Sequence, residues 1–225
     1  MHTTLRLISA WLFHEDPDRH GSLPALLLLL TFISGLMDAA SFINLGGVFV
    51  TIMTGNMVLL ALAIADSHWS AALAFLTSLV FFLLGAVIAA RIATRIGARL
   101  RIVAVLAGME ATLISGAMAA YFAGASNHMI IALLATAMGV QNSVVHKLRV
   151  PDMTTTLITR AIVGVASDSF DAAVRRRLLS IGVLFIGALL GGLLEIRCSL
   201  AVVLISVAVL LALTAVLAHT APPVD

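Results

Sequence analysis

The stretch GLMDAASFINLGGVFVTIMTGN, from Gly35 to Asn56, places one aspartate, two asparagines and a Gly-Gly pair inside otherwise apolar sequence. A related stretch, GVQNSVVHKLRVPDMTTTLITR, begins at Gly139. Each copy opens with glycine, has Asp or Asn three residues later and closes on a run that contains threonine. Two altered copies of one pattern predict a chain built from an internal repeat.

The composition around these copies is that of a membrane protein. Of the 225 residues, 61% are hydrophobic and only 11% are charged, whereas soluble domains carry about 25% charged residues. The mean hydropathy is +1.13. Several apolar runs are long enough to cross a ~30 Å hydrocarbon core as helices, and the alternating pattern of a membrane barrel is absent. The sequence predicts an all-α integral membrane protein.

The apolar runs define the domain organisation. We expect residues 1–22 to form a cytoplasmic tail or interfacial segment, residues 23–219 a single transmembrane domain and residues 220–225 a short tail. The runs lie at about 23–45, 48–65, 69–90, 102–123, 129–145, 153–166, 178–196 and 199–218.

The repeat extends over both halves of this domain, with repeat 1 at about 23–124 and repeat 2 at about 128–219. The offset between matching residues stays near 104, which favours a duplication. The matching pairs are Gly35 and Gly139, Asp38 and Asn142, Thr54 and Thr159, and Leu84-Gly85-Ala86 and Ile186-Gly187-Ala188. Weak internal symmetry of this kind is typical of transporter folds.

Two topologies are compatible with the apolar runs. If all of them span, eight helices form two parallel halves of four, and the arginines at 91–101 and at 175–177 fall on opposite sides of the membrane. If 48–65 and 153–166 are short re-entrant or broken helices, about six full spans remain. The N-terminus and all these arginines then become cytoplasmic, as the positive-inside rule favours. The two halves are then inverted. We favour this second version, although 48–65 is apolar enough to span.

Two acidic residues lie deep in the predicted spans. Asp38 shares a helical face with Gly35, Ala39 and Phe42, and Glu110 lies well inside the span at 102–123. An ionisable group at this depth is costly unless it is paired, protonated or facing water, so each is a candidate functional residue. The alternative for each is a structural carboxyl that hydrogen-bonds to a neighbouring helix.

Polar residues near these acids complete a candidate site for a solute or an ion. Gly46-Gly47 and the run Thr54, Gly55 and Asn56 have the composition of places where a helix breaks. Unwound backbone is tolerated at membrane depth only where it lines a cavity or is buried in protein. A continuous helix with back-bonded threonines remains the alternative. In the second copy Gln141 and Asn142 supply similar polar groups.

Arg160 is the other charged residue of the repeat. It follows Thr159 and stands where the first copy has Gly55, while Asn142 stands where the first copy has Asp38. Each half therefore keeps one charge, of opposite sign. We predict that Asp38 and Arg160 pair across the interface between the halves, each offsetting the desolvation of the other.

The sequence lacks the common motifs of enzymes, metal sites and nucleic-acid-binding proteins. The sequence has no HExxH, GxSxG or P-loop motif, so we expect no enzyme and no catalytic residues. One cysteine, Cys198, and scattered histidines predict neither a metal site nor a cofactor. The arginines are grouped between apolar runs and are better explained by membrane orientation than by nucleic-acid binding.

The paired motifs resemble those of the YoaK family, bacterial inner-membrane proteins defined by a domain of unknown function. The resemblance covers about residues 23–213. It implies a multi-pass protein of about six spans in the inner (plasma) membrane, with no established activity. The family tends to carry Thr-Gly in the second copy, where this chain has Thr159-Arg160. The residues that carry the resemblance are G-L-M-D-A-A-S-F from Gly35, M-T-G-N from Met53, G-V-Q-N-S from Gly139, T-T-T-L-I-T from Thr154 and the glycine-rich span around Gly187.

Two functions follow as hypotheses. The first is a transporter of a small polar or ionic solute, with its site near the midplane between the repeats and Asp38 as a coupling or counter-charge group. The second is a non-transporting membrane partner or assembly protein that docks other helices through small-residue faces. The lipid bilayer is the expected partner in both, an unknown small solute or ion in the first, and the sequence leaves a homo-oligomer open.

Overall fold

The structure is a computed structural model that describes residues 22–148 and 172–220. Six helices of the described residues are long and apolar enough to cross a membrane. They are α3 (Leu23–Asn44), α5 (Trp69–Ala93), α6 (Arg99–Phe122), α7 (Asn127–Leu148), α9 (Ala172–Arg197) and α10 (Leu200–Thr220). A shorter apolar helix, α4 (Met53–Ala65), follows α3. The predicted all-α membrane fold with about six spans is confirmed.

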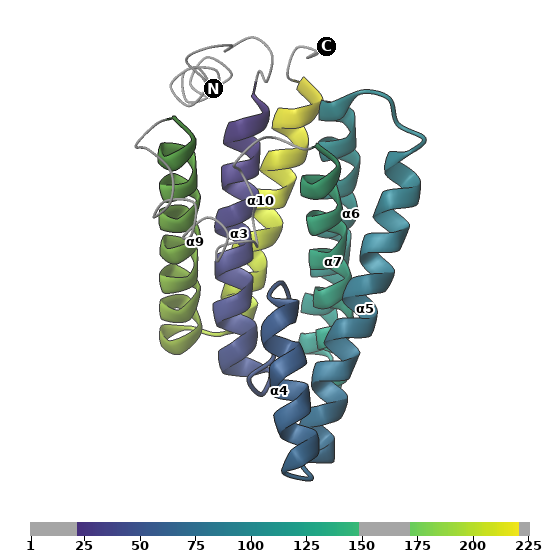
Figure 1. Ribbon diagram of the computed structural model, residues 1–225, viewed down its shortest axis with the longest axis vertical. Helices are drawn as coiled ribbons and strands as arrows, with labels where there is room; N and C mark the ends of the chain where they lie inside the picture. The colour runs from purple at the N-terminus through teal and green to yellow at the C-terminus, as the bar shows by residue number, and fades with distance from the viewer. Residues whose placement is uncertain (1–21, 149–171, 221–225) are drawn as a thin grey trace.

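The first helix break lies where the Gly-Gly pair predicts it. Helix α3 ends at Asn44, and Gly46 and Gly47 adopt φ of +76° and +81°. Glycine adopts these left-handed values without the steric cost of a Cβ atom. Residues 45–52, which we call the re-entrant loop, turn back from the end of α3 toward the middle of the bundle, and α4 then descends to the same end (Figure 1). The first half therefore has three spans and one re-entrant segment.

The two halves run in opposite directions. In Figure 1, α3, α5 and α6 run down, up and down, whereas α7, α9 and α10 run up, down and up. The end of α7 and the start of α9 lie on one side of the bundle. The eight-span alternative is therefore wrong. The predicted second re-entrant stretch at 153–166 lies outside the described residues.

Helix pairing repeats across the halves. The most extensive packing is between α5 and α7, between α3 and α9, and between α6 and α10. The first span of each half thus packs on the second span of the other half, and the two third spans pack on each other. This is the pattern that a two-fold axis between inverted repeats produces.

Matching glycines allow the closest helix approaches. A Cβ atom on Gly35 of α3 would overlap the Leu184 carbonyl of α9, and one on Gly139 of α7 would overlap the Phe82 carbonyl of α5. The partner glycines obey the same rule: Gly187 lies against Phe32, and Gly85 lies against Thr136. Small residues let helix backbones approach closely in lipid, where no hydrophobic effect drives helices together. The duplicated crossings confirm the internal repeat.

Charged residues separate the two ends of the bundle. The α5–α6 connection with Arg91, Arg95, Arg99 and Arg101, the end of α7 and the start of α9 all lie at the end of the bundle where α3 begins and α10 ends (Figure 1). The opposite end has the turn with Asp66 and His68, whose exposed side chains are 2.7 Å apart. The positive-inside rule predicts that the arginine-rich end faces the cytoplasm.

We predict that reporter fusions will report this orientation. Green fluorescent protein fused after Asp225 should fluoresce, and alkaline phosphatase fused there should be inactive. Both results are expected when the C-terminus is cytoplasmic. Alkaline phosphatase inserted at Ser67 should be active. Active phosphatase at both positions would contradict the six-span arrangement.

We also predict that Gly85→Ala lowers thermal stability in detergent, because the added methyl group meets the Thr136 backbone. Overpacking of this kind costs about 1–3 kcal/mol. Gly116→Ala of α6 is the matched control, since a Cβ atom there meets no other atom within 4 Å. Equal melting temperatures for the two variants would argue against a close α5–α7 crossing.

Candidate functional site

The centre of the candidate site is the re-entrant loop, which lies at the depth of Asp38. Asp38 precedes the end of α3 by six residues, or about 9 Å along the helix axis. The rings of Phe42 on α3 and Phe49 on the loop stack with their centroids 4.8 Å apart. Loop backbone therefore lies well inside the membrane-spanning part of the bundle, where every N–H and C=O group needs a partner from the protein.

The Asp38 carboxylate supplies three of these interactions. Its Oδ1 accepts the backbone N–H groups of Val50 at 2.9 Å and of Thr51 at 2.8 Å. Its Oδ2 accepts the hydroxyl of Thr51. Asp38 and Thr51 are both buried, at 4% and 3% exposure. In this structure Asp38 is thus a backbone-capping carboxylate, which is the structural role left open for it above.

Asn56 fixes the loop from the other side. Its Oδ1 accepts the Phe49 N–H at 3.0 Å, and its Nδ2 donates to the Phe49 carbonyl at 2.6 Å and to Ser78 Oγ at 3.0 Å. Ser78, on α5, donates to the same Phe49 carbonyl at 2.9 Å. Asn56 and Ser78 are fully buried. The side chains of α3, α4 and α5 thus replace the hydrogen bonds that Phe49, Val50 and Thr51 lose by leaving helical geometry.

The run Thr54, Gly55 and Asn56 does not break a helix, because all three residues lie in the first turn of α4. Thr54 is exposed on the outer side of α4 and is therefore not brought to Asp38. Gly55 lies against the Phe49 ring, which a Cβ atom would approach to 3.1 Å. Of these three predicted ligands, only Asn56 joins the polar network around the loop.

Gln141 and Asn142 occupy a different part of the bundle. Gln141, on α7, donates to Ser34 Oγ at 2.6 Å and to the Leu30 carbonyl at 3.1 Å, so it joins the first spans of the two halves. Its Oε1 is buried and accepts no hydrogen bond within the described residues. Asn142 donates back to Met138 in its own helix at 2.9 Å.

Glu110 is buried at 1% exposure on α6. Its Oε1 also lacks a hydrogen-bond donor among the residues that the structure describes. Glu110 is therefore the deep carboxyl for which the fold supplies no evident structural role.

Thr159 and Arg160 lie outside the described residues, and so does the predicted pairing of Arg160 with Asp38. The partners that Asp38 has within the described part of the chain are those of the loop.

Sequence reasoning missed three residues of these networks: Thr51, Ser78 and Ser34. A lone Ser or Thr in an apolar helix usually bonds back to its own carbonyls, so composition gave no reason to single them out. The repeat held one signal for Ser78. Ser180 lies 102 residues after it, the same separation as that of Gly85 and Gly187, and is buried as well.

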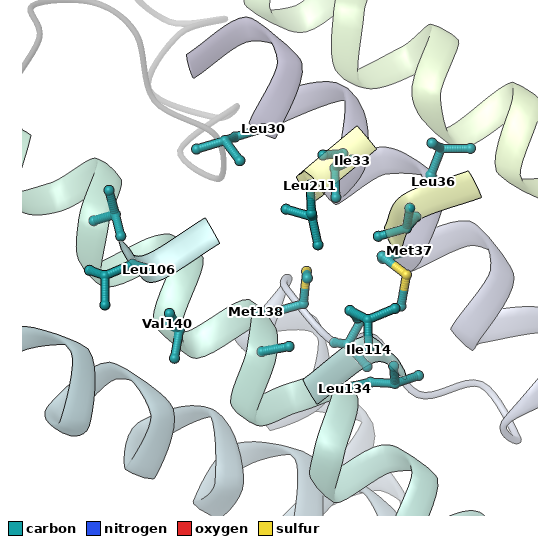
Figure 2. Packing of buried hydrophobic residues seen from close by; sticks show 14 of the residues in the cluster. Leu30, Ile33, Leu36, Met37, Leu106, Ile114, Leu134, Met138, Val140 and Leu211 are labelled. Carbon is teal, nitrogen blue, oxygen red and sulfur yellow. The ribbon is translucent and has the colours of Figure 1, made fainter. Parts of the chain in front are cut away.

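The centre of the bundle is apolar. Figure 2 shows side chains of α3, α6, α7 and α10 converging there, among them Ile33, Met37, Ile114, Leu134 and Met138. These five residues, which we call the central cluster, are fully buried. The centre of the bundle is therefore closed by apolar side chains in this conformation.

A groove of about 370 Å³ lies between the lower part of α3, Phe49 and α9. Its lining is apolar, with Phe42, Ile43 and Leu193 among the residues, so it offers a polar solute no ligand. Within residues 22–148 and 172–220, no group of three or more His, Cys, Asp or Glu side chains could hold a metal ion.

Inverted halves of three spans, with a re-entrant loop fixed by buried polar side chains, define a multi-pass α-helical membrane protein. Residues 26–217 match the family described as "Protein of unknown function (DUF1275)". The chain belongs to this family.

The chain is similar to the UPF0700 transmembrane protein YoaK of Bacillus subtilis (strain 168). The two are 31% identical over 147 residues, which is 64% of this chain and 65% of the relative. The match thus spans slightly less than two thirds of the relative's length. No solved structure matches the chain. The predicted family resemblance is confirmed.

We predict that Asp38→Ala will free the re-entrant loop, because two buried N–H groups then lose their acceptor. Each unsatisfied group costs about 1–3 kcal/mol, so local opening should rise at least about tenfold. Hydrogen exchange of peptides covering residues 45–56 measures this.

Asp38→Asn is the matched variant. The amide oxygen can still accept both N–H groups, and the Thr51 hydroxyl can turn to accept from the amide nitrogen. Exchange in this variant should stay near that of the wild type. Equal exchange in the alanine variant and the wild type would remove the capping role.

Proposed function

We propose that the chain is a transporter of a small polar or ionic solute that works by alternating access between its inverted halves. One observation carries the proposal: inverted three-span halves surround a non-helical segment that buried polar side chains hold at membrane depth. Secondary transporters share this combination, in which discontinuous helices at the repeat interface form the site. A protein that only docked partners would have no need for unwound backbone in the membrane.

The central cluster would act as a barrier to the solute in this conformation. Ile33 and Met37 come from the first half, and Leu134 and Met138 from the second, so the barrier is made by both halves. Rocking of one half against the other would part these apolar side chains, together with the hydrogen bonds from Gln141 to Ser34 and Leu30. In this proposal the conformation is a closed state. The proposed location of the protein is the cytoplasmic membrane.

The re-entrant loop would act as the gate beside this barrier. Phe49, Val50 and Thr51 bond to side chains of α3, α4 and α5, all of which belong to the first half. The loop would therefore move with its own half. Its backbone groups would change partners from protein to solute when the halves separate.

A second function, that of a non-transporting membrane partner or assembly protein, is favoured by one observation. The apolar faces of α5 and α9 are exposed, with Leu83 and Phe185 among their side chains. This surface and a permanently closed central cluster would suffice for docking other helices. Both proposals are non-enzymatic.

Flux measurements separate the two functions. We predict that proteoliposomes with the wild-type chain show saturable uptake of at least one solute from a panel of amino acids, sugars, carboxylates and inorganic ions. Uptake in Asp38→Ala should fall at least about tenfold, equivalent to ~1.4 kcal/mol, because the gate loses its anchor. Asp38→Asn should retain most of the uptake.

Thiol labelling tests whether the central cluster opens even if the solute panel lacks the transported solute. In a Cys198→Ser background, Met138→Cys should react with a water-soluble maleimide if the central cluster opens. His68→Cys, in the exposed turn, and Phe185→Cys, on the exposed apolar face of α9, are the positive and negative controls. No uptake together with an unreactive Met138→Cys would favour the assembly protein.

A further inference from the structure

Glu110 is a buried titratable group of the described residues that the proposed gate does not use. Its neighbours on the same face of α6, one turn away on each side, are Leu106 and Ile114, both fully buried in the apolar core. Figure 2 shows these two side chains at the core. Glu110 itself is 1% exposed, and its Oε1 has no donor among the described residues.

Cationic groups are absent from the surroundings of Glu110 in the described part of the chain. Helix α6 packs on α7 and α10. The titratable residues of α7 are His128 in its first turn and His146 and Lys147 in its last turn, and α10 has only His219 in its last turn. On α6 itself, Arg99, Arg101 and Tyr121 lie at least two turns from Glu110. The described residues therefore give an ionised Glu110 no counter-charge in a low-dielectric setting, which strongly disfavours the charged form.

The position of Glu110 links it to the movement of the halves. Helix α6 belongs to the first half, whereas α7 and α10, against which it packs, belong to the second. Glu110 therefore lies in the interface that alternating access must open. Gln141 of α7 adds a second buried acceptor without a donor on the second half. Separation of the halves would bring water to Glu110, and closure would remove it.

We propose that Glu110 is a proton-binding site in the interface between the halves, and that the proton is the coupling ion of transport. The coupling part rests on the proposed transporter function. In the closed state the carboxyl carries its proton and is neutral. When the interface opens to one side, the O–H bond breaks and the proton passes to water, and the carboxylate takes up a proton from water on the same side or the other before the dry interface closes again. No oxidant, reductant or other reactant enters.

Infrared spectroscopy of the full chain in liposomes tests the proton site without any solute. The C=O stretch of a protonated carboxylic acid is distinct from the bands of carboxylates. We expect this band at neutral pH in the wild type and in the matched control Asp38→Asn, but not in Glu110→Gln. It should shift in D₂O, because bulk protons exchange at Glu110, and it should fade at alkaline pH. A band that is the same in Glu110→Gln, or that neither shifts in D₂O nor fades, overturns the proposal.

A second measurement avoids the variants. Dicyclohexylcarbodiimide is an apolar reagent that modifies protonated carboxyls in membranes, and mass spectrometry locates the adduct. We expect modification of Glu110 in the wild-type chain, decreasing as the pH rises. An unmodified Glu110 at all pH values overturns the proposal.

These results separate the site from the transporter function. A proton site with no uptake of any panel solute and an unreactive Met138→Cys would refute transport and with it the coupling role, while the proton site would stand. Uptake without a titrating Glu110 would refute the proton site alone.

Discussion

The capping of unwound backbone by Asp38 is the interaction on which the arrangement of the first half depends. In hydrocarbon no water can replace a lost backbone hydrogen bond, so a chain that leaves helical geometry inside the membrane must find acceptors and donors in its own side chains. Asp38 supplies acceptors for Val50 and Thr51, and Asn56 with Ser78 satisfies both backbone groups of Phe49. With these groups satisfied, α4 can begin within the bundle and leave on the side from which the loop entered. That return sets the direction of α5 and, with it, of α6 and α7.

The glycine crossings are the second constraint, and they act between the halves. Gly35 and Gly187 bring α3 against α9, and Gly139 and Gly85 bring α7 against α5. Because each crossing joins a first span to a second span of the other half, neither half can form its closest contacts alone. The bundle is thus held together by two equivalent crossings that flank the pair α6 and α10. An inverted repeat with this packing is well suited to a rocking movement, since each half is joined to the other along two similar seams.

Polar side chains at membrane depth divide into two classes by their hydrogen bonds. Asp38, Asn56 and Ser78 have partners for the groups that they bring into the bundle, and they position backbone. Glu110 and Gln141 each keep a buried oxygen without a donor among the described residues. Unsatisfied buried acceptors are rare in folded proteins and ask for an explanation. Here both lie where the two halves meet, so the unsatisfied groups are placed where the proposed movement would give them water.

The sequence by itself determined the class, the number of spans, the repeat and the position of the first break. Each of these depends on local properties: apolar length, the spacing of arginines, and a Gly-Gly pair that accepts positive φ.

The tertiary structure decided which polar residues act together. Thr54 and Asn56 look alike in sequence, but only Asn56 faces the loop, because a shift of two residues on α4 moves a side chain to the opposite side of the helix. Asp38 and Glu110 likewise look alike as single acids in apolar runs. What separates them is their neighbours, since Val50 and Thr51 fold back onto Asp38, whereas the helices packed on α6 offer no donor to Glu110 Oε1 among the described residues. Such neighbours are set by packing between distant segments, which no local pattern in the chain specifies.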